Sequence, residues 1–243
     1  MHDDDTGRGR LYSRREALAL LGAGAMTMLA GKGSARAAAD APRAASCIAR
    51  PALTEGPFFV DEKLNRSDVR PDPKSGDLPQ GVLLRLGFRV SQLGGGACAP
   101  LPNAQVDVWQ CDAAGRYSDV QNPSDSTVGQ RFLRGYQLTD SNGAADFVTI
   151  YPGCYSGRTA HIHFKIRTSS TAGKSEFTSQ LFFDDAISDQ IFAQPPYARA
   201  SGNRTRNARD GIFRHGGEQL LLRPTKDGVT YAAAFDIALA APV

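Results

Sequence analysis

The sequence lacks an excess of charge of either sign. Its 243 residues include 28 Lys and Arg against 25 Asp and Glu, a formal net charge of +3. Six of the basic and four of the acidic residues lie within residues 1–37, so the rest of the chain carries 22 basic against 21 acidic side chains. A protein that binds nucleic acid needs clustered Lys and Arg to neutralise phosphates. The near balance therefore argues against nucleic acid as a partner.

A hydrophobic run long enough to span a membrane is also missing. The longest apolar stretch, from Ala17 to about Ala30, is shorter than the roughly 20 residues that a transmembrane helix needs. It follows the pair Arg14-Arg15 and precedes Ala-Arg-Ala at residues 35–37, a small-residue cleavage pattern. These are the parts of a secretory peptide, and paired arginines are typical of its twin-arginine form. Residues 1–37 are therefore predicted to be a twin-arginine export signal, which implies a periplasmic or secreted protein with no stable membrane span.

After residue 37 the sequence lacks any long amphipathic helical pattern. Residues 38–81 are rich in Pro, Asp and Arg without periodicity and predict an extended N-terminal arm. Over residues 82–243, short segments of period-two alternation are separated by Gly-, Asn- and Pro-containing turns, while residues 186–217 are loop-like. This pattern predicts an all-β fold, an antiparallel β-sandwich with long loops. The segments with strand character are 81–90, 104–110, 144–150, 159–167, 176–183, 219–222 and 229–238.

Cysteine is scarce, and its spacing excludes some functions. The four residues Cys47, Cys98, Cys111 and Cys154 contain no CxxC pair, which argues against a zinc ribbon or a redox motif. An even number of cysteines in an exported chain permits two disulfides. Three pairings are possible, and the sequence does not distinguish them.

Histidine is equally scarce, yet two of the four histidines stand together as His161-Ile162-His163. On a strand, residues i and i+2 point to the same side, so both imidazoles leave one face while Ile162 faces the core. Two adjacent neutral imidazoles make a metal site the first hypothesis. A pair of hydrogen-bonded structural histidines is the alternative. A ferrous site completed by Asp184 or Asp185 stays open as well.

Tyrosines and glycines surround the histidine pair in ordered motifs. The motifs are Thr54-Glu55-Gly56-Pro57-Phe58, Val108-Trp109-Gln110 with Gly115-Arg116-Tyr117, Pro152-Gly153-Cys154-Tyr155, Arg158-Thr159-Ala160-His161-Ile162-His163-Phe164, and Ser179-Gln180-Leu181-Phe182-Phe183. Together they resemble the intradiol ring-cleavage dioxygenases, the family of the protocatechuate and catechol dioxygenases. The resemblance extends roughly from Thr54 to Phe183 and is far more specific than the histidine pair by itself.

The resemblance implies a mononuclear, non-haem Fe(III) ion held by four side chains. The ligands would be Tyr117, Tyr155, His161 and His163. In this family the axial ligand leaves the metal when substrate binds and then acts as a base, and Tyr155 would have that role. Arg158 would offset the negative charge of the bound substrate.

The resemblance also implies which residues support or line the substrate site. Gln180 would support Arg158. The substrate-binding residues would be Thr54, Gly56, Pro57, Phe58, Trp109, Arg158 and Gln180. With O₂ as co-substrate, the enzyme would open a catechol-type ring between its two hydroxyl-bearing carbons and release a muconate-type dicarboxylic acid. The identity of the catechol, and assembly into a homo-oligomer, stay open.

The implied ligand set is consistent with the chemistry of ferric iron. A free tyrosine has a pKa of about 10 and loses its proton readily only beside a strong Lewis acid. Two phenolates and a hydroxide would balance the three charges of the ion. Two alternatives carry weight: a secreted non-catalytic, transthyretin-like sandwich that serves as a binding module, and a metalloenzyme of another type that uses His and Asp. Neither explains why the two tyrosines stand in the order of the family.

Overall fold

The computed structural model describes residues 47–94, 97–121, 126–170, 173–197 and 204–240. The export signal predicted for residues 1–37 and the beginning of the predicted arm lie outside these ranges. Residues 47–82 contain no strand, and two isolated bridges, Asn65 to Tyr136 and Asp68 to Val148, attach them to strands. No helix within the described ranges is long and apolar enough to cross a membrane.

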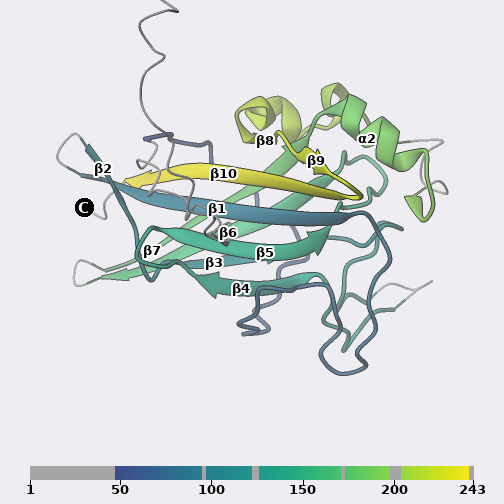
Figure 1. Cartoon of the computed structure of the whole chain (residues 1–243), viewed down its shortest axis with the longest axis horizontal. Coiled ribbons are helices and arrows are strands. Elements are labelled where there is room, and N and C mark those ends of the chain that lie inside the picture. Colours follow the sequence, from purple (N-terminus) through teal and green to yellow (C-terminus); the bar gives the residue numbers. More distant parts are fainter. Residues whose placement is uncertain (1–46, 95–96, 122–125, 171–172, 198–203, 241–243) are drawn as a thin grey trace, which may run out of the picture. The chain divides into compact units, whose positions relative to one another are not determined.

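Two five-stranded sheets form a sandwich (Figure 1). The first contains β1 (Leu83–Gly94), β2 (Ala97–Pro100), β5 (Ala144–Ile150), β9 (Thr225–Asp227) and β10 (Thr230–Ala240). The second contains β3 (Gln105–Trp109), β4 (Arg134–Leu138), β6 (His161–Ser170), β7 (Gly173–Phe183) and β8 (Leu221–Leu222). In the first sheet, β1 is hydrogen-bonded to β2, β5 and β10, and β10 also pairs with β9. The second sheet has the order β4-β3-β6-β7-β8.

The core lies between the sheets and is built by alternating side chains. From β6, the side chains of Ile162, Phe164 and Ile166 are at most 1% exposed. The ring of Phe164 lies 5.3 Å from that of Phe88 on β1 and 5.5 Å from that of Phe235 on β10. Buried aromatic contacts of this kind connect the two sheets, and each large side chain contributes roughly 1.5–3 kcal/mol through burial. The predicted all-β sandwich, with Ile162 facing the core, is confirmed.

The structure adds three features to the predicted pattern. Most pairings are antiparallel, but β10 runs parallel to β1 and β8 runs parallel to β7. The predicted segments do not include strands β2, β4 and β9, because all three are short and largely exposed or half-buried. A helix of eight residues, α2 (Asp185–Phe192), overlaps the loop-like residues 186–217, and its first turn is capped by the Asp184 carboxylate. A helix this short gives little periodic signal.

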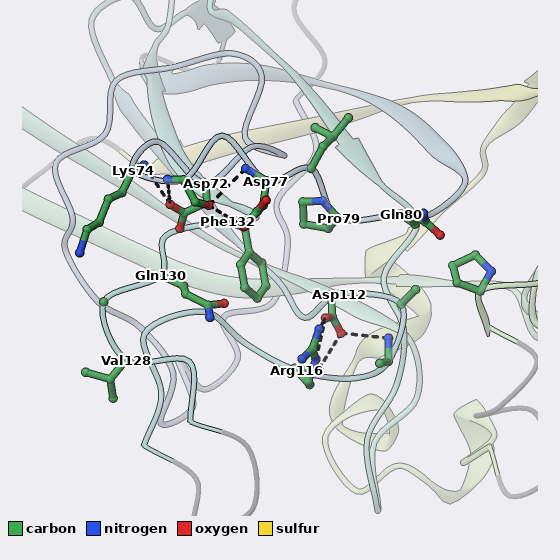
Figure 2. A pocket seen from close by; sticks show the side chains of 16 residues that line it. Asp72, Lys74, Asp77, Pro79, Gln80, Asp112, Arg116, Val128, Gln130 and Phe132 are labelled. Atoms are coloured by element: carbon green, nitrogen blue, oxygen red, sulfur yellow. Dashed lines mark hydrogen bonds and ion pairs between the residues drawn. The ribbon is translucent and has the colours of Figure 1, made fainter.

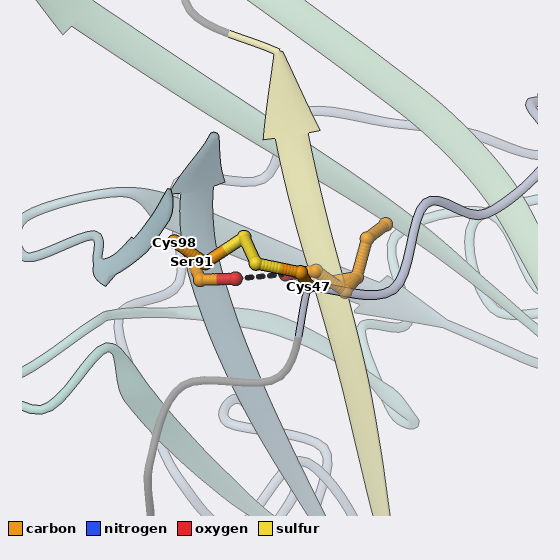
Figure 3. Close-up of a disulfide and its surroundings, with 4 residues drawn as sticks. Cys47, Ser91 and Cys98 are labelled. Atoms are coloured by element: carbon orange, nitrogen blue, oxygen red, sulfur yellow. Dashed lines mark hydrogen bonds between the residues drawn. A yellow bond between two sulfur atoms is a disulfide. The ribbon is translucent and has the colours of Figure 1, made fainter. Parts of the chain in front are cut away.

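One disulfide connects the described start of the arm to the first sheet. Cys47 bonds to Cys98 on β2, with 5.5 Å between the Cα atoms and 51 residues of separation (Figure 3). Closing a loop of that length stabilises the fold by about 4 kcal/mol in the chain-entropy model. Cys111 and Cys154 are free and buried, and burial raises the pKa of both thiols. The structure therefore contains one of the two disulfides that the cysteine count permits.

Candidate metal centre

Strand β6 places both histidines of the predicted site on the face opposite the core. His161 and His163 are 0% and 1% exposed, so this face is as buried here as the core face. Their Nε2 atoms are 3.1 Å apart. In the neighbouring strands, His163 stands in register with Trp109 of β3 and Gln180 of β7. Strand alternation therefore brings two imidazoles to one point.

Tyr117 reaches the histidines from the loop that follows β3. The Asp112 carboxylate accepts hydrogen bonds from the amides of Ala114 and Arg116 and pairs with the Arg116 guanidinium at 2.8 Å, which fixes the turn before the tyrosine (Figure 2). The Tyr117 Oη lies 3.2 Å from His161 Nε2. The first predicted phenol ligand is therefore within hydrogen-bond distance of the first predicted imidazole ligand.

Tyr155 comes from a second loop that crosses the first at very short distance. A Cβ on Gly115 would meet the carbonyl oxygen of Cys154 at 2.4 Å, and one on Gly153 would meet that of Asp112 at 2.4 Å. Glycine at both positions lets the two backbones touch, which explains the glycines in these motifs. The Tyr155 ring then lies 5.9 Å from the Tyr117 ring and 5.6 Å from the His161 ring.

Burial determines the protonation of these four side chains. It lowers the pKa of His161 to about 3 and that of His163 well below its usual range, so both imidazoles are neutral. The Nδ1 of His161 lies 2.7 Å from the Thr159 carbonyl and donates to it, which leaves the Nε2 lone pair free. Burial also raises the pKa of Tyr117 and of Tyr155. Deprotonation of the two phenols therefore needs a strong Lewis acid beside them.

This donor set fits a ferric ion. Nitrogen lone pairs and a phenol oxygen converge in a buried place, and both imidazoles there are neutral and available as donors. Phenolate is a hard anionic donor and imidazole a borderline one, the combination expected for a highly charged transition metal. Groups of three or more His, Cys, Asp and Glu suited to a metal do not occur in the described part of the chain.

The carboxylates of the ferrous alternative lie in other contacts. Asp184 caps α2 by accepting from the Ala186 amide at 2.7 Å, and Asp185 pairs with Arg204 at 2.7 Å. Neither is hydrogen-bonded to a histidine in the described structure. His215, the remaining described histidine, is the exposed last residue of the 3-10 helix Phe213–His215, with its Nδ1 2.6 Å from the Gly211 carbonyl.

Arg158 stands beside the two phenols and is held on three sides. Its Nη1 donates to the Tyr155 Oη at 3.3 Å, its Nη2 donates to the Gln180 Oε1, and its Nε donates to Asp210 Oδ2 at 2.9 Å. Gln180 is 0% exposed and donates its own Nε2 to the Thr54 carbonyl at 2.8 Å. Sequence patterns did not reveal Asp210, because a single Asp in a loop-like stretch gives no local signal.

The arm covers the cluster of predicted ligands. A Cβ on Gly56 would stand 3.3 Å from the His163 ring, so the backbone lies directly on that imidazole. Phe58 stacks on Tyr117 with 4.5 Å between the ring centres. Trp109 stacks on His163 at 5.0 Å from the neighbouring strand and is 1% exposed, so it packs behind the ligand rather than on an open wall.

An ion-pair cluster attaches the same arm to β6. Lys165 pairs with Glu55 and lies 4.2 Å over the Phe59 ring, and Arg167 pairs with Asp61 at 2.9 Å. Glu55 is the immediate neighbour of the Gly56 that contacts His163. The cluster therefore holds the arm where it closes over the imidazoles.

Two surface hollows lie near the cluster. One of about 440 Å³ is lined by the arm at residues 52–54 and by Gly211, Ile212 and His215. Since the Thr54 carbonyl accepts from Gln180, this hollow borders the Arg158 side of the site. The other, of about 750 Å³, lies beside the turn formed by Asp112 and Arg116 and contains none of the predicted ligands (Figure 2).

The fold and the site together define an all-β protein with a buried centre of two tyrosines and two histidines. Comparisons with known proteins agree. A family model described as dioxygenase matches residues 54–239. The beta chain of protocatechuate 3,4-dioxygenase from Burkholderia cepacia is 30% identical over 188 residues, which are 74% of this chain and 72% of that one.

A hydroxyquinol 1,2-dioxygenase from Corynebacterium glutamicum is 26% identical over 209 residues, 76% of this chain and 62% of that one. Among solved structures, an intradiol ring-cleavage dioxygenase from Tetranychus urticae is 30% identical with a TM-score of 0.66, over 80% of this chain and 94% of that one. The chain belongs to the intradiol ring-cleavage dioxygenase family.

Proposed function

We propose that the chain holds one mononuclear, non-haem Fe(III) ion through Tyr117, Tyr155, His161 and His163 and cleaves a catechol-type diol with O₂. One observation carries this proposal: four side chains from three separate segments meet in one buried cluster. The Nε2 atoms of the histidines are 3.1 Å apart, and the Tyr117 Oη is 3.2 Å from one of them. Membership of the intradiol family supports the same ligand set.

A ferric ion held by these four side chains would supply the Lewis acidity that makes a catechol-type ring reactive toward O₂. The chain itself supplies the proton acceptor. Of the two tyrosines, Tyr155 is the more accessible proton acceptor, since it is half-buried whereas Tyr117 is only 4% exposed. The Oη of Tyr155 also accepts from the cationic Arg158, which favours the phenolate form. Tyr155 Oη is therefore the atom that takes a proton from a substrate hydroxyl.

Arg158 and Gln180 act on the anionic ring. The guanidinium is a cation, and it lies beside Tyr155 on the side where the diol enters. A fixed cation in a partly buried site stabilises negative charge as it develops. Gln180 bridges this guanidinium and the Thr54 carbonyl, so it connects the cation to the arm.

The arm closes the substrate side of the site in this proposal. Thr54 and Pro57 are exposed, while Gly56 and Phe58 are half-buried against His163 and Tyr117. These four residues of the arm are placed to contact an incoming substrate ring. Trp109 contributes by packing on the His163 imidazole.

We also propose that residues 1–37 export the protein to the periplasm or the medium. The paired arginines followed by a short apolar run support this proposal. Replacing both Arg14 and Arg15 by Lys should retain the unprocessed chain in the cytoplasm, as cell fractionation and blotting would show. Export of the double variant at the wild-type level would contradict the twin-arginine assignment.

Spectroscopy and oxygen uptake test the proposed enzyme. Purified protein should contain about one iron per chain and be reddish, because phenolate donors transfer charge to ferric iron. Oxygen uptake should follow addition of one of catechol, protocatechuate or hydroxyquinol, with both oxygen atoms recovered in a dicarboxylic acid by mass spectrometry. A folded preparation that stays colourless and inert after ferric reconstitution would overturn the assignment.

A further inference from the structure

Asp210 is a fully buried carboxylate that follows the short 3-10 helix at Asn207–Arg209. Its Oδ2 accepts from Arg158 Nε and from the Thr159 amide, both at 2.9 Å. Its Oδ1 accepts from the amides of Ile212 and Phe213 at 2.7 and 3.1 Å. One carboxylate oxygen therefore binds the arginine, and the other binds the turn that follows Asp210.

The contact with Arg158 determines where the rest of the guanidinium points. This group is planar and rigid, so fixing its Nε edge also fixes Nη1 and Nη2. In the structure those two nitrogens donate to Tyr155 Oη and Gln180 Oε1. We propose that Asp210 is the positioning residue for Arg158, holding its cationic edge toward the substrate; this inference rests on the proposed function.

Charge balance supports the same role. The Arg158 side chain is 13% exposed, so its charge is poorly solvated before the anionic substrate arrives. Asp210 supplies the opposite charge on the side away from Tyr155. Burial raises the pKa of Asp210, but the hydrogen bonds from the Thr159 and Phe213 amides and from Arg158, together with the Arg158 charge, outweigh burial and hold this pKa below its usual range. The carboxylate is thus ionised at neutral pH, and Arg158 can stay in place between turnovers.

A purely structural role for Asp210 is the competing explanation, since Oδ1 also anchors the turn at residues 212–213. Asn207 offers a matched control in the same loop. Its Oδ1 accepts from the Thr159 hydroxyl at 2.7 Å, and its Nδ2 donates to the Phe183 carbonyl at 2.8 Å. Asn207→Ala loosens this loop without removing a contact to Arg158.

A double-mutant cycle on the iron-loaded enzyme separates the two explanations. Asp210→Asn should lower kcat per bound iron by about 100-fold, because misplacement of a catalytic group by about 1 Å has effects of that size. When Asp210→Asn is added to the Arg158→Ala variant, it should lower kcat per bound iron by less than about a further twofold. Two residues that act through one contact are coupled, so their effects do not add. Asn207→Ala should lower the Tm yet change kcat per iron by less than about threefold in either background. If Asp210→Asn does not accumulate as folded protein, Asp210→Glu replaces it in the cycle.

A crystal structure of the Asp210 variant provides a readout that does not depend on activity. We expect the Arg158 guanidinium to turn away from Tyr155 and Gln180. The inference is overturned if Arg158 stays in place, if the kcat loss persists in the Arg158→Ala background, or if Asn207→Ala reproduces that loss. A wild-type enzyme that cleaves no catechol, combined with a displaced Arg158 in the variant, would contradict the proposed function and leave the positioning role supported.

Discussion

The two faces of strand β6 are almost equally buried and chemically opposite. Toward the core, Ile162 and Phe164 are 1% and 0% exposed, while on the other face His161 and His163 are 0% and 1% exposed. The core face packs against apolar side chains of the other sheet. The opposite face is covered by an arm and two loops that bring phenols, a guanidinium and carboxylates. Burial therefore does not distinguish a core from a site in this strand, whereas the hydrogen-bonding partners do.

Replacing His161 by Ala, on the polar face, should have the largest effect. Loss of one imidazole removes a ligand from the proposed ion, whose Lewis acidity contributes several kcal/mol, so activity should fall at least about 1000-fold. Iron analysis and the absorbance of the phenolate complex measure the loss. His215→Ala, at an exposed histidine outside the cluster, should keep both iron and colour. Full iron occupancy in the His161 variant would contradict the ligand assignment.

Replacing Phe164 by Ala tests the other face of the strand. This ring is 0% exposed and contacts Phe88, Phe177 and Phe235. Its truncation should lower the free energy of unfolding by about 3–5 kcal/mol, as measured by urea denaturation. The folded fraction should still bind one iron per chain. A loss below about 1 kcal/mol would mean that the two sheets do not depend on this contact.

Removing the disulfide should have a somewhat smaller effect on stability than the core truncation. Cys98→Ser frees the start of the described arm from β2 and should lower the free energy of unfolding by about 2–4 kcal/mol. Iron content should not change, since the disulfide lies on the first sheet and the proposed ligands on and around the second. Reducing agent should lower the Tm of the wild type but not that of Cys98→Ser. If reducing agent lowered the Tm of both proteins equally, a disulfide other than the one formed by Cys98 would be responsible for the stabilisation.

The smallest expected effect is a pH dependence confined to the polar face. The pKa of Asp210 is lower in the folded protein than its usual value near 3.9, so its contribution is complete above about pH 4. That contribution is lost as the pH falls through the folded-state pKa. The difference in unfolding free energy between wild type and Asp210→Asn should therefore narrow as the pH falls below about 4, as urea titrations would measure. The difference in the free energy of unfolding between wild type and Phe164→Ala should not change with pH. If this difference narrowed in the same way, general acid unfolding and not Asp210 would explain the effect.

Much of the candidate site could be predicted from local sequence because the residues proposed as ligands obey local rules. His161 and His163 share a face through strand alternation alone. Tyr117 and Tyr155 follow glycine turns, and the structure shows that Gly115 and Gly153 allow their two loops to touch. The sandwich followed from short alternating segments between turns. Each of these inferences needs only a few consecutive residues.

Other features could not be predicted, because they depend on contacts between distant segments. Strand β10 lies parallel to β1 although their sequences are separated by most of the domain. The pairing of Cys47 with Cys98 was one of three connectivities that the spacing left open. The packing of Trp109 on His163 depends on the register of β3 with β6.

The sequence by itself determined the alternation of β6, the glycine turns and the order of the family's motifs, because these depend on bond geometry and on the period of a strand. Only the tertiary structure decided that Asp210, 52 residues beyond Arg158, turns back to hold that guanidinium. No local pattern marks such a residue. Its contact with Arg158 depends on a loop that is attached to the second sheet where Asn207 donates to the Phe183 carbonyl of β7.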